Sequence, residues 1–144
     1  MINVALFGFG RIGQMHAANL SKNKQIKILY VYEKLPHLNK LAIKLYNCKI
    51  ENDYNKIFSD KKVNIIFISS PTNTHIKFIE EGMKNKKTIF CEKPLDLNIN
   101  KIIKTFKKVK KIKPRIQLGF NRRYDPGHFN IKKDLDRNKI GKLE

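Results

Sequence analysis

Apolar positions along this chain form two kinds of pattern that alternate from the first residues onward. Short, nearly unbroken apolar runs rich in Ile, Val, Phe and Tyr are typical of strands buried on both faces. Segments in which apolar residues recur every three or four positions predict amphipathic helices. The runs that predict strands cover residues 2–7, 26–32, 48–50, 63–68, 88–91 and 115–119. The segments that predict helices cover about residues 12–24, 35–46, 53–58, 74–84, 98–111 and 127–139.

The order of these elements predicts the fold class. Strands and helices alternate six times, with no internal repeat and no linker between them. Short connections and right-handed crossovers turn such an order into a parallel sheet with helices on both faces. We therefore expect an α/β, Rossmann-type, doubly wound, mostly parallel sheet. A chain of 144 residues forms one such domain and has no room for a second.

Three details of the helices follow from the same pattern. Asn73 can cap the helix of residues 74–84, and Gly141 can end the last helix. The helix of residues 98–111 alternates lysines with an apolar stripe of Ile102, Ile103, Phe106 and Val109. A basic amphipathic helix can bind membranes or acidic partners, but more often its stripe packs on a sheet. We expect the packed arrangement here.

The sequence Gly8-Phe9-Gly10-Arg11-Ile12-Gly13 lies between the first predicted strand and the first predicted helix. In this context Gly8 allows a tight turn, Gly10 lets a pyrophosphate approach the backbone, and Gly13 lets the helix pack closely on the strand. The free N–H groups of the helix start would face the phosphates. The motif predicts dinucleotide binding, and the alternative is a merely structural glycine turn.

Glu33 ends the second predicted strand, 20 residues after Gly13. A dinucleotide fold needs a carboxylate at this place to hold the hydroxyl groups of the adenosine ribose. The alternative is a solvated glutamate at a strand end. A carboxylate repels a 2′-phosphate and so favours NAD over NADP, although Lys34 next to it weakens that preference.

Two further loops follow buried strands and should meet at the same edge of the sheet. The fourth strand leads into residues 69–73, and the fifth leads into Glu92-Lys93-Pro94. Ligands of open α/β sheets bind at the carboxyl ends of the strands. His75 follows the first of these loops, and it either packs near the helix cap or lines the cofactor site.

Charge alone would suggest a nucleic-acid partner, because the formal net charge is +19. The cations are 26 lysines and only 5 arginines, and they are scattered rather than gathered in an arm or tail. Lys, Ile and Asn, which are all abundant here, share A/T-rich codons. We therefore attribute the charge to composition and expect no nucleic-acid partner.

Composition also limits the location and the metal chemistry. No run approaches the roughly 20 apolar residues of a membrane span, and no signal peptide is recognisable, so we expect a cytoplasmic protein without a membrane partner. Cys48 and Cys91 are the only cysteines, and their spacing fits no metal motif. We interpret them as buried free thiols, with a disulfide as the alternative. We predict no metal site.

Three stretches together are similar to those of one family: residues 8–16, 91–95 (Cys-Glu-Lys-Pro-Leu) and 119–126 (Gly-Phe-Asn-Arg-Arg-Tyr-Asp-Pro). They resemble the glucose-fructose oxidoreductase / inositol dehydrogenase / rhizopine catabolism (Gfo/Idh/MocA) family, and within it the inositol dehydrogenases. The first stretch is also found in glyceraldehyde-3-phosphate dehydrogenase, so the other two decide. The resemblance implies the cofactor-binding part of an NAD(P)-dependent oxidoreductase that oxidises a secondary hydroxyl of a polyol or sugar.

The resemblance also implies roles for individual residues. Lys93 would be the catalytic lysine that faces the substrate hydroxyl, Glu92 would hold the nicotinamide ribose, and Pro94 would be a cis proline. The residues implied to contact the cofactor are Gly8, Phe9, Gly10, Arg11, Ile12, Gly13, Glu33, Ser70, Thr72, Asn73, His75, Glu92, Lys93, Asn121 and Arg122. An ammonium beside the reacting oxygen would stabilise developing negative charge.

The family pattern divides the chain at about residue 122. Residues 1–122 would form the NAD(P)-binding domain, and residues 123–144 would begin a truncated substrate domain with a helix. The Asp-x-x-x-His pair that family members use for substrate binding has no match here, and Asp125 and His128 have the wrong spacing for it. The alternatives to an enzyme are a non-catalytic nucleotide-binding module or half of a split enzyme. The small-molecule partner of the chain would be a polyol or sugar substrate. Its protein partner would be a second copy of the same chain, in a homo-oligomer, or a separately encoded substrate domain.

Overall fold

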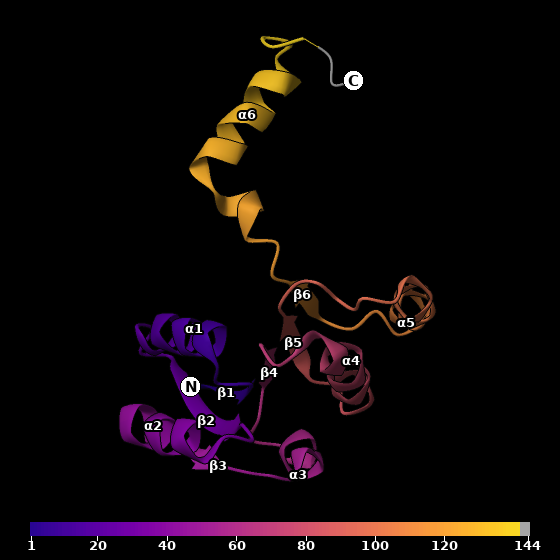
Figure 1. The fold of residues 1–144 in the computed structure, drawn as a ribbon. Coiled ribbons are helices and arrows are strands. Elements are labelled where there is room, and N and C mark those ends of the chain that lie inside the picture. The colour runs from indigo at the N-terminus through magenta and orange to yellow at the C-terminus, as the bar shows by residue number, and fades with distance from the viewer. Residues whose placement is uncertain (142–144) are drawn as a thin grey trace.

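The computed structural model describes residues 1–141, in which one six-stranded sheet runs through the centre (Figure 1). Every neighbouring pair of strands is parallel, and the order across the sheet is β3-β2-β1-β4-β5-β6. The strands are β1 (Ile2–Phe7), β2 (Ile26–Tyr32), β3 (Lys49–Ile50), β4 (Ile65–Ile68), β5 (Thr88–Cys91) and β6 (Ile116–Leu118). The predicted doubly wound parallel sheet is confirmed.

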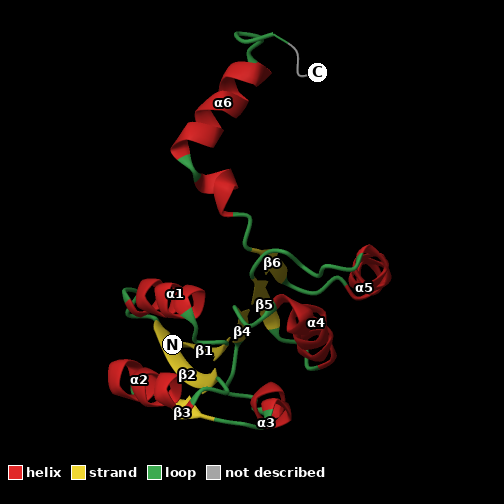
Figure 2. Ribbon diagram, viewed as in Figure 1, coloured by secondary structure: helices red, strands yellow, loops and turns green. Residues whose placement is uncertain are grey.

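Helices cover both faces of this sheet, as Figure 2 shows. They are α1 (Arg11–Ser21), α2 (Pro36–Tyr46), α3 (Tyr54–Ser59), α4 (His75–Lys84), α5 (Ile99–Ile112) and α6 (Pro126–Asp136), with short 3-10 turns η1 (Thr72–Thr74) and η2 (Asn121–Tyr124). α1 and α2 lie on one face, and α3, α4 and α5 lie on the other (Figure 1).

Strand β1 lies in the middle of the sheet and is buried on both faces. Val4 and Leu6 pack in a cluster with residues of α1 and α2, whereas Ala5 and Phe7 pack in a cluster with residues of α3 and α4. All four side chains are fully buried. Successive strand residues point to opposite faces, so the unbroken apolar run of β1 supplies both halves of the core.

The carboxyl ends of four strands lie level at one edge. The N–H of Ser69 donates to the carbonyl of Phe7 (2.8 Å), the N–H of Glu92 donates to that of Ile68 (2.9 Å), and the N–H of Gly119 donates to that of Cys91 (2.8 Å). Winding reverses direction between β1 and β4, which is where an open α/β sheet leaves a ligand crevice. The loops that follow β1, β4, β5 and β6 therefore stand side by side at this crevice.

Two predicted helix ends are wrong. Asn73 does not cap α4, because a 3-10 turn intervenes and Thr74 takes the cap position without a side-chain bond to the helix. The last helix ends at Asp136, five residues before Gly141. Gly141 does have a positive φ of 78°, but it lies beyond the helix end.

The expected packing of α5 on the sheet is only half correct. Thr105 is the buried residue of this helix, with Ile102 and Val109 half-buried beside it. Ile103 and Phe106 remain 47% and 54% exposed. Because α5 lies at the edge of the sheet, beyond α4, one half of its apolar stripe has nothing to pack against among the described residues.

The two cysteines are free and buried, as predicted. Cys91 lies in β5 with no exposed surface, and burial raises the pKa of its thiol to about 12. Burial also raises the pKa of Cys48. Both thiols are therefore core side chains.

Candidate functional site

Two glycines of the β1–α1 turn are required by the packing of the chain itself. Gly8 has φ = 89°, and a Cβ on it would lie 2.6 Å from the backbone of Ser70. A Cβ on Gly13 would lie 2.2 Å from the carbonyl oxygen of Gly8. The hydroxyl of Ser69 donates to that same carbonyl at 2.9 Å. The turn is thus pressed tightly against the loop after β4.

Gly10 differs from the other two, because a Cβ there would meet no atom within 4 Å. The start of α1 next to it has no side-chain cap and no acidic residue in its first turn. Arg11 and Ile12 are exposed. Uncapped N–H groups at a helix start, beside a glycine that leaves the backbone open, form a site that fits an anionic group such as a pyrophosphate.

Glu33 accepts three hydrogen bonds from backbone N–H groups, and the one from Phe9 ties it to the same turn. Its carboxylate accepts from Phe9 at 2.7 Å, from Lys34 at 2.7 Å and from Leu35 at 3.1 Å. The side chain of Phe9 is fully buried and meets Tyr46 edge-on. Phe9 can therefore contact a ligand only through its backbone, whereas Glu33 is held at the mouth of the crevice.

A hollow of about 490 Å³ opens beside this carboxylate. It brings together four residues that the sequence predicted for the cofactor, namely Gly8, Glu33, Ser70 and Asn73. Lys34 and Lys77 line it as well. Its position between the ends of β1, β2 and β4 suits the adenosine end of a dinucleotide.

Glu92 receives partners that the sequence did not reveal. His16 of α1 lies 2.7 Å from its carboxylate, with the imidazole packed against the rings of Phe67 and Phe90. A Cβ on Gly119 would lie 3.0 Å from the same carboxylate. His16 and Gly119 stand in the first and third of the stretches that carry the resemblance, so all three stretches meet at Glu92. That shared membership was the only signal that could have found them.

Lys93 is exposed at the edge of the sheet, and the Lys93-Pro94 peptide bond is cis, as the resemblance implied. Lys93 lines a hollow of about 410 Å³ together with Asn121 and Arg122 of η2. Arg122 in turn pairs with Asp125 at 3.3 Å. The structure therefore brings the predicted catalytic lysine together with two of the predicted cofactor residues.

His75 is buried, with 2% of its surface exposed, and both of its ring nitrogens have partners. Nδ1 lies 2.8 Å from the carbonyl oxygen of Pro94, and Nε2 lies 2.8 Å from that of Ser70. His75 is thus packed between the two loops, and its contact with a cofactor stays a prediction. Thr72 is half-buried in η1, three residues before it.

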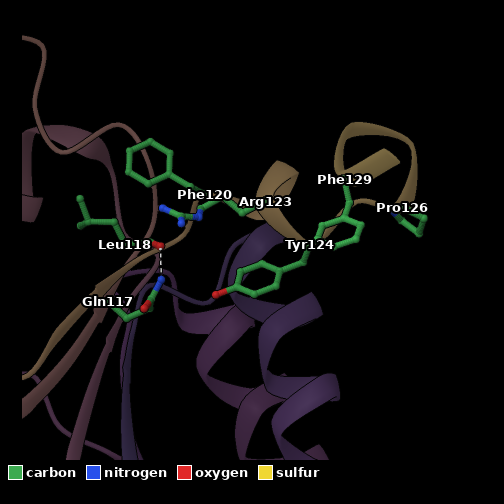
Figure 3. Close-up of a pocket in the computed structure, with 7 residues that line it drawn as sticks. All are labelled: Gln117, Leu118, Phe120, Arg123, Tyr124, Pro126 and Phe129. Carbon is green, nitrogen blue, oxygen red and sulfur yellow. Dashed lines mark hydrogen bonds between the residues drawn. The ribbon is translucent and has the colours of Figure 1, made fainter. Parts of the chain in front are cut away.

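A larger open hollow of about 780 Å³ lies between β6 and the start of α6, and Figure 3 shows its lining. Phe120, Arg123, Tyr124 and Phe129 contribute most of its wall, together with Gln117, Leu118 and Pro126. None of the predicted site residues lines it. It exists because α6 projects away from the sheet and leaves this side uncovered (Figure 1).

Two further properties of residues 1–141 bear on the site. No three His, Cys, Asp or Glu side chains in this part of the chain gather where they could hold a metal ion. None of the helices described is both long enough and apolar enough to cross a membrane.

Residues 2–120 match the protein family described as "Oxidoreductase family, NAD-binding Rossmann fold". This match covers most of the chain and includes the glycine turn, Glu33 and the Glu92-Lys93-Pro94 loop. The chain belongs to this oxidoreductase family. The predicted resemblance is therefore confirmed, and the domain is the NAD-binding Rossmann domain of inositol dehydrogenase-like oxidoreductases.

Individual relatives support the same assignment. Inositol 2-dehydrogenase of Rhizobium meliloti (strain 1021) is 32% identical over 143 residues, which are 99% of this chain and 43% of that protein. Myo-inositol 2-dehydrogenase of Thermotoga maritima is 34% identical over 98% of this chain and 42% of its own length. The crystal structure of scyllo-inositol dehydrogenase from Lactobacillus casei with NAD(H) and scyllo-inositol superimposes with a TM-score of 0.90 at 29% identity, over 98% of this chain and 42% of that one. The chain thus spans less than half the length of these relatives.

Proposed function

We propose that this chain is the cofactor-binding part of an NAD-dependent dehydrogenase that oxidises a secondary hydroxyl of a polyol or sugar, most closely an inositol. The observation that carries the proposal is a convergence at one edge of the sheet. An open phosphate turn, the fixed carboxylate of Glu33 and the exposed ammonium of Lys93 follow β1, β2 and β5. A dinucleotide laid along this edge would have its adenosine end at Glu33 and its nicotinamide end near Glu92 and Lys93.

Lys93 is the catalytic residue in this proposal. Oxidation of a secondary alcohol removes the proton of the hydroxyl group and a hydride from the carbon that carries this group. Bound NAD supplies the hydride acceptor. An ammonium beside the alcohol oxygen stabilises the negative charge that develops there and can take part in proton transfer. Asn121 and Arg122, which share a hollow with Lys93, would complete this side of the cofactor site.

Glu33 favours NAD over NADP in this proposal. Its carboxylate is held by three backbone N–H groups at the mouth of the adenosine hollow, where a 2′-phosphate would meet it. Lys34 and Lys77 line the same hollow and would reduce the repulsion. We therefore expect a preference for NADH rather than exclusion of NADPH.

The chain divides in function at about residue 122 in this proposal. Residues 1–122 would bind the cofactor, and residues 123–144 would lead into substrate-binding elements, supplied by a longer chain, a separately encoded domain or a second copy. Residues 142–144 of this second segment lie outside the described residues. The free thiols of Cys48 and Cys91 suit the cytoplasm, which is where we place the protein.

A fluorescence titration with NADH tests the proposal. The chain has no tryptophan, so bound NADH can be followed without indole emission. We expect saturable binding that Gly10→Val weakens by about a hundredfold, because the new side chain fills the space of the pyrophosphate. Lys40→Gln, on the exposed side of α2, is the matched control and should bind like wild type. Absence of binding by wild type at millimolar NADH would refute the proposal.

A non-catalytic nucleotide-binding module is the second candidate. It is favoured by the exposure of α6, which has no buried residue in the described chain. Adding inositol and NAD to the chain, alone and with a substrate domain of a relative, separates the two candidates. NADH formation that Lys93→Ala abolishes supports the dehydrogenase, and NADH binding without turnover in both mixtures supports the module.

A further inference from the structure

The arrangement around His75 requires two hydrogen-bond donors on one imidazole. Its two nitrogens face the carbonyl oxygens of Pro94 and Ser70, each at 2.8 Å. A carbonyl oxygen can only accept a hydrogen bond, whereas a neutral imidazole has one N–H and one lone pair. A neutral ring would therefore point a lone pair at a carbonyl oxygen inside the core. Only the imidazolium, with an N–H on both nitrogens, satisfies both contacts.

The electrostatics of the position make these two bonds decisive. His75 is the first residue of α4, and the positive end of a helix dipole does not favour a cation. Burial does not favour one either. Charge-assisted hydrogen bonds to two fixed carbonyl oxygens are what can hold a charged ring here. The ionisable residues close to these positions in the chain are Lys77, Glu80 and Glu81 of α4 and Glu92, Lys93 and Asp96 after β5, of which Asp96 is also buried and lies two residues after Pro94.

The two carbonyl groups belong to the two loops that border the crevice. Ser70 follows β4 and lines the hollow beside Gly8 and Glu33. Pro94 follows β5 and comes directly after Lys93. No strand pairing continues past Glu92, whose N–H donates to Ile68. The ring of His75 is thus a direct link between the adenosine side of the crevice and the Glu92-Lys93-Pro94 loop beyond the end of the sheet, called the Lys93 loop below.

We propose that His75 is a positioning residue that, as an imidazolium, fixes the Lys93 loop and the loop after β4 at a set distance from each other. Its link to chemistry rests on the proposed function, because Lys93 is the catalytic residue there. The link itself is a property of the protein without any ligand. It can therefore be tested apart from cofactor binding.

The first experiment counts the protons on the ring. In a ¹⁵N-labelled sample at pH 7.5, we expect both ring nitrogens of His75 to resonate as N–H nitrogens, rather than as one N–H nitrogen and one unprotonated nitrogen. Loss of the signals in His75→Gln assigns them. A single N–H on the His75 ring at this pH overturns the proposal.

The second experiment uses two variants that each retain one donor. The amide of His75→Asn can occupy the place of Nδ1 and keep the bond to Pro94, while that of His75→Gln can occupy the place of Nε2 and keep the bond to Ser70. Hydrogen exchange should then respond in a crossed pattern. We expect about tenfold faster exchange at Lys93 and Leu95 in the Gln variant only, and at Thr72 and Thr74 in the Asn variant only.

The outcomes are distinguishable. Uniformly faster exchange across the chain in both variants would indicate general destabilisation and would contradict a positioning role. NADH affinity should fall severalfold in both variants, because each releases one side of the cofactor site. If the two variants show the crossed exchange pattern but the wild-type chain binds no NADH, the link through His75 exists and the proposed function fails. If NADH binds equally to wild type and both variants, the positioning role is wrong.

Discussion

Strand β1, with 6 residues, and helix α6, with 11, are opposites in burial. β1 has four consecutive residues with no exposed surface, packed against helices on both faces of the sheet. α6 has no buried residue, and Phe129 and Ile131 on it are 60% and 55% exposed. The difference teaches that the centre of the sheet is enclosed by its own helices, whereas the segment after β6 has apolar surface with no cover among the described residues.

The largest expected difference between β1 and α6 is the loss of stability when one phenylalanine in each is replaced by alanine. Phe7→Ala should destabilise the fold by about 4 kcal/mol, because the ring is fully buried against Tyr32, Phe58 and Phe78. Phe129→Ala should change the free energy of unfolding by less than about 0.5 kcal/mol. Urea denaturation followed by circular dichroism measures both. Equal losses would mean that α6 is part of the cooperative core.

Two glycines of the β1–α1 turn should differ in how much an added methyl group lowers stability. Gly13→Ala should cost about 3 kcal/mol, because its Cβ would meet the carbonyl of Gly8 at 2.2 Å. Gly10→Ala should cost within about 1 kcal/mol, mainly through the weaker helix cap, yet it should still impair NADH binding. Urea midpoints and NADH titrations of the two variants decide this. A folded Gly13→Ala with wild-type stability would contradict the close packing of α1 on the turn.

A third and smaller effect concerns α5, which stands between the two extremes. The Asn98 side chain accepts from the N–H groups of Asn100 and Lys101, so Asn98→Ala should lower stability by about 1 kcal/mol. Asn100→Ala is the matched control, because Asn100 is exposed and caps nothing, and it should leave stability unchanged or raised. Thermal unfolding of the two variants side by side would reveal whether α5 unfolds with the core.

The smallest effect should be confined to α6. The Asp125 carboxylate accepts hydrogen bonds from the side chain and from the backbone N–H of His128, and these lower the pKa of Asp125 to about 2. The folded pKa lies below the ordinary value of 3.8, so this cap stabilises α6 above about pH 4 and is lost as the pH falls towards 2. The amide signal of His128 should report the loss between these pH values. In Asp125→Asn, whose amide oxygen keeps the cap at every pH, the step should disappear; its persistence would assign it to another group.

The sequence predicted the fold because its local signals agreed with one another. Strands β1, β2 and β5 begin and end where the apolar runs do, and the doubly wound order follows from alternation and connection length. The glycine turn, Glu33 and the Glu92-Lys93-Pro94 loop lie at the predicted edge. These features depend on residues close in sequence or on rules that hold for all parallel sheets.

One error had a local cause, and the other arose where distant contacts decide. Asn73 had the chemistry of a cap, but it lies inside the 3-10 turn Thr72–Thr74, and the helix cap falls on Thr74 instead. The stripe of α5 was correctly recognised as apolar, but nothing in the stripe indicates that Ile103 and Phe106 lie beyond the edge of the sheet. Periodicity tells which side of a helix is apolar and not what lies opposite that side.

The site shows the same division. Sequence by itself determined the parallel α/β fold, the phosphate turn and the loops at its crevice, because hydrophobic period and glycine geometry are local properties. Only the tertiary structure decided that His16 faces Glu92, that Gly10 alone of the three glycines is left open, and that His75 bridges Ser70 and Pro94. Such contacts join residues up to 76 positions apart. They arise only when the sheet aligns the ends of its strands, and no local pattern contains that alignment.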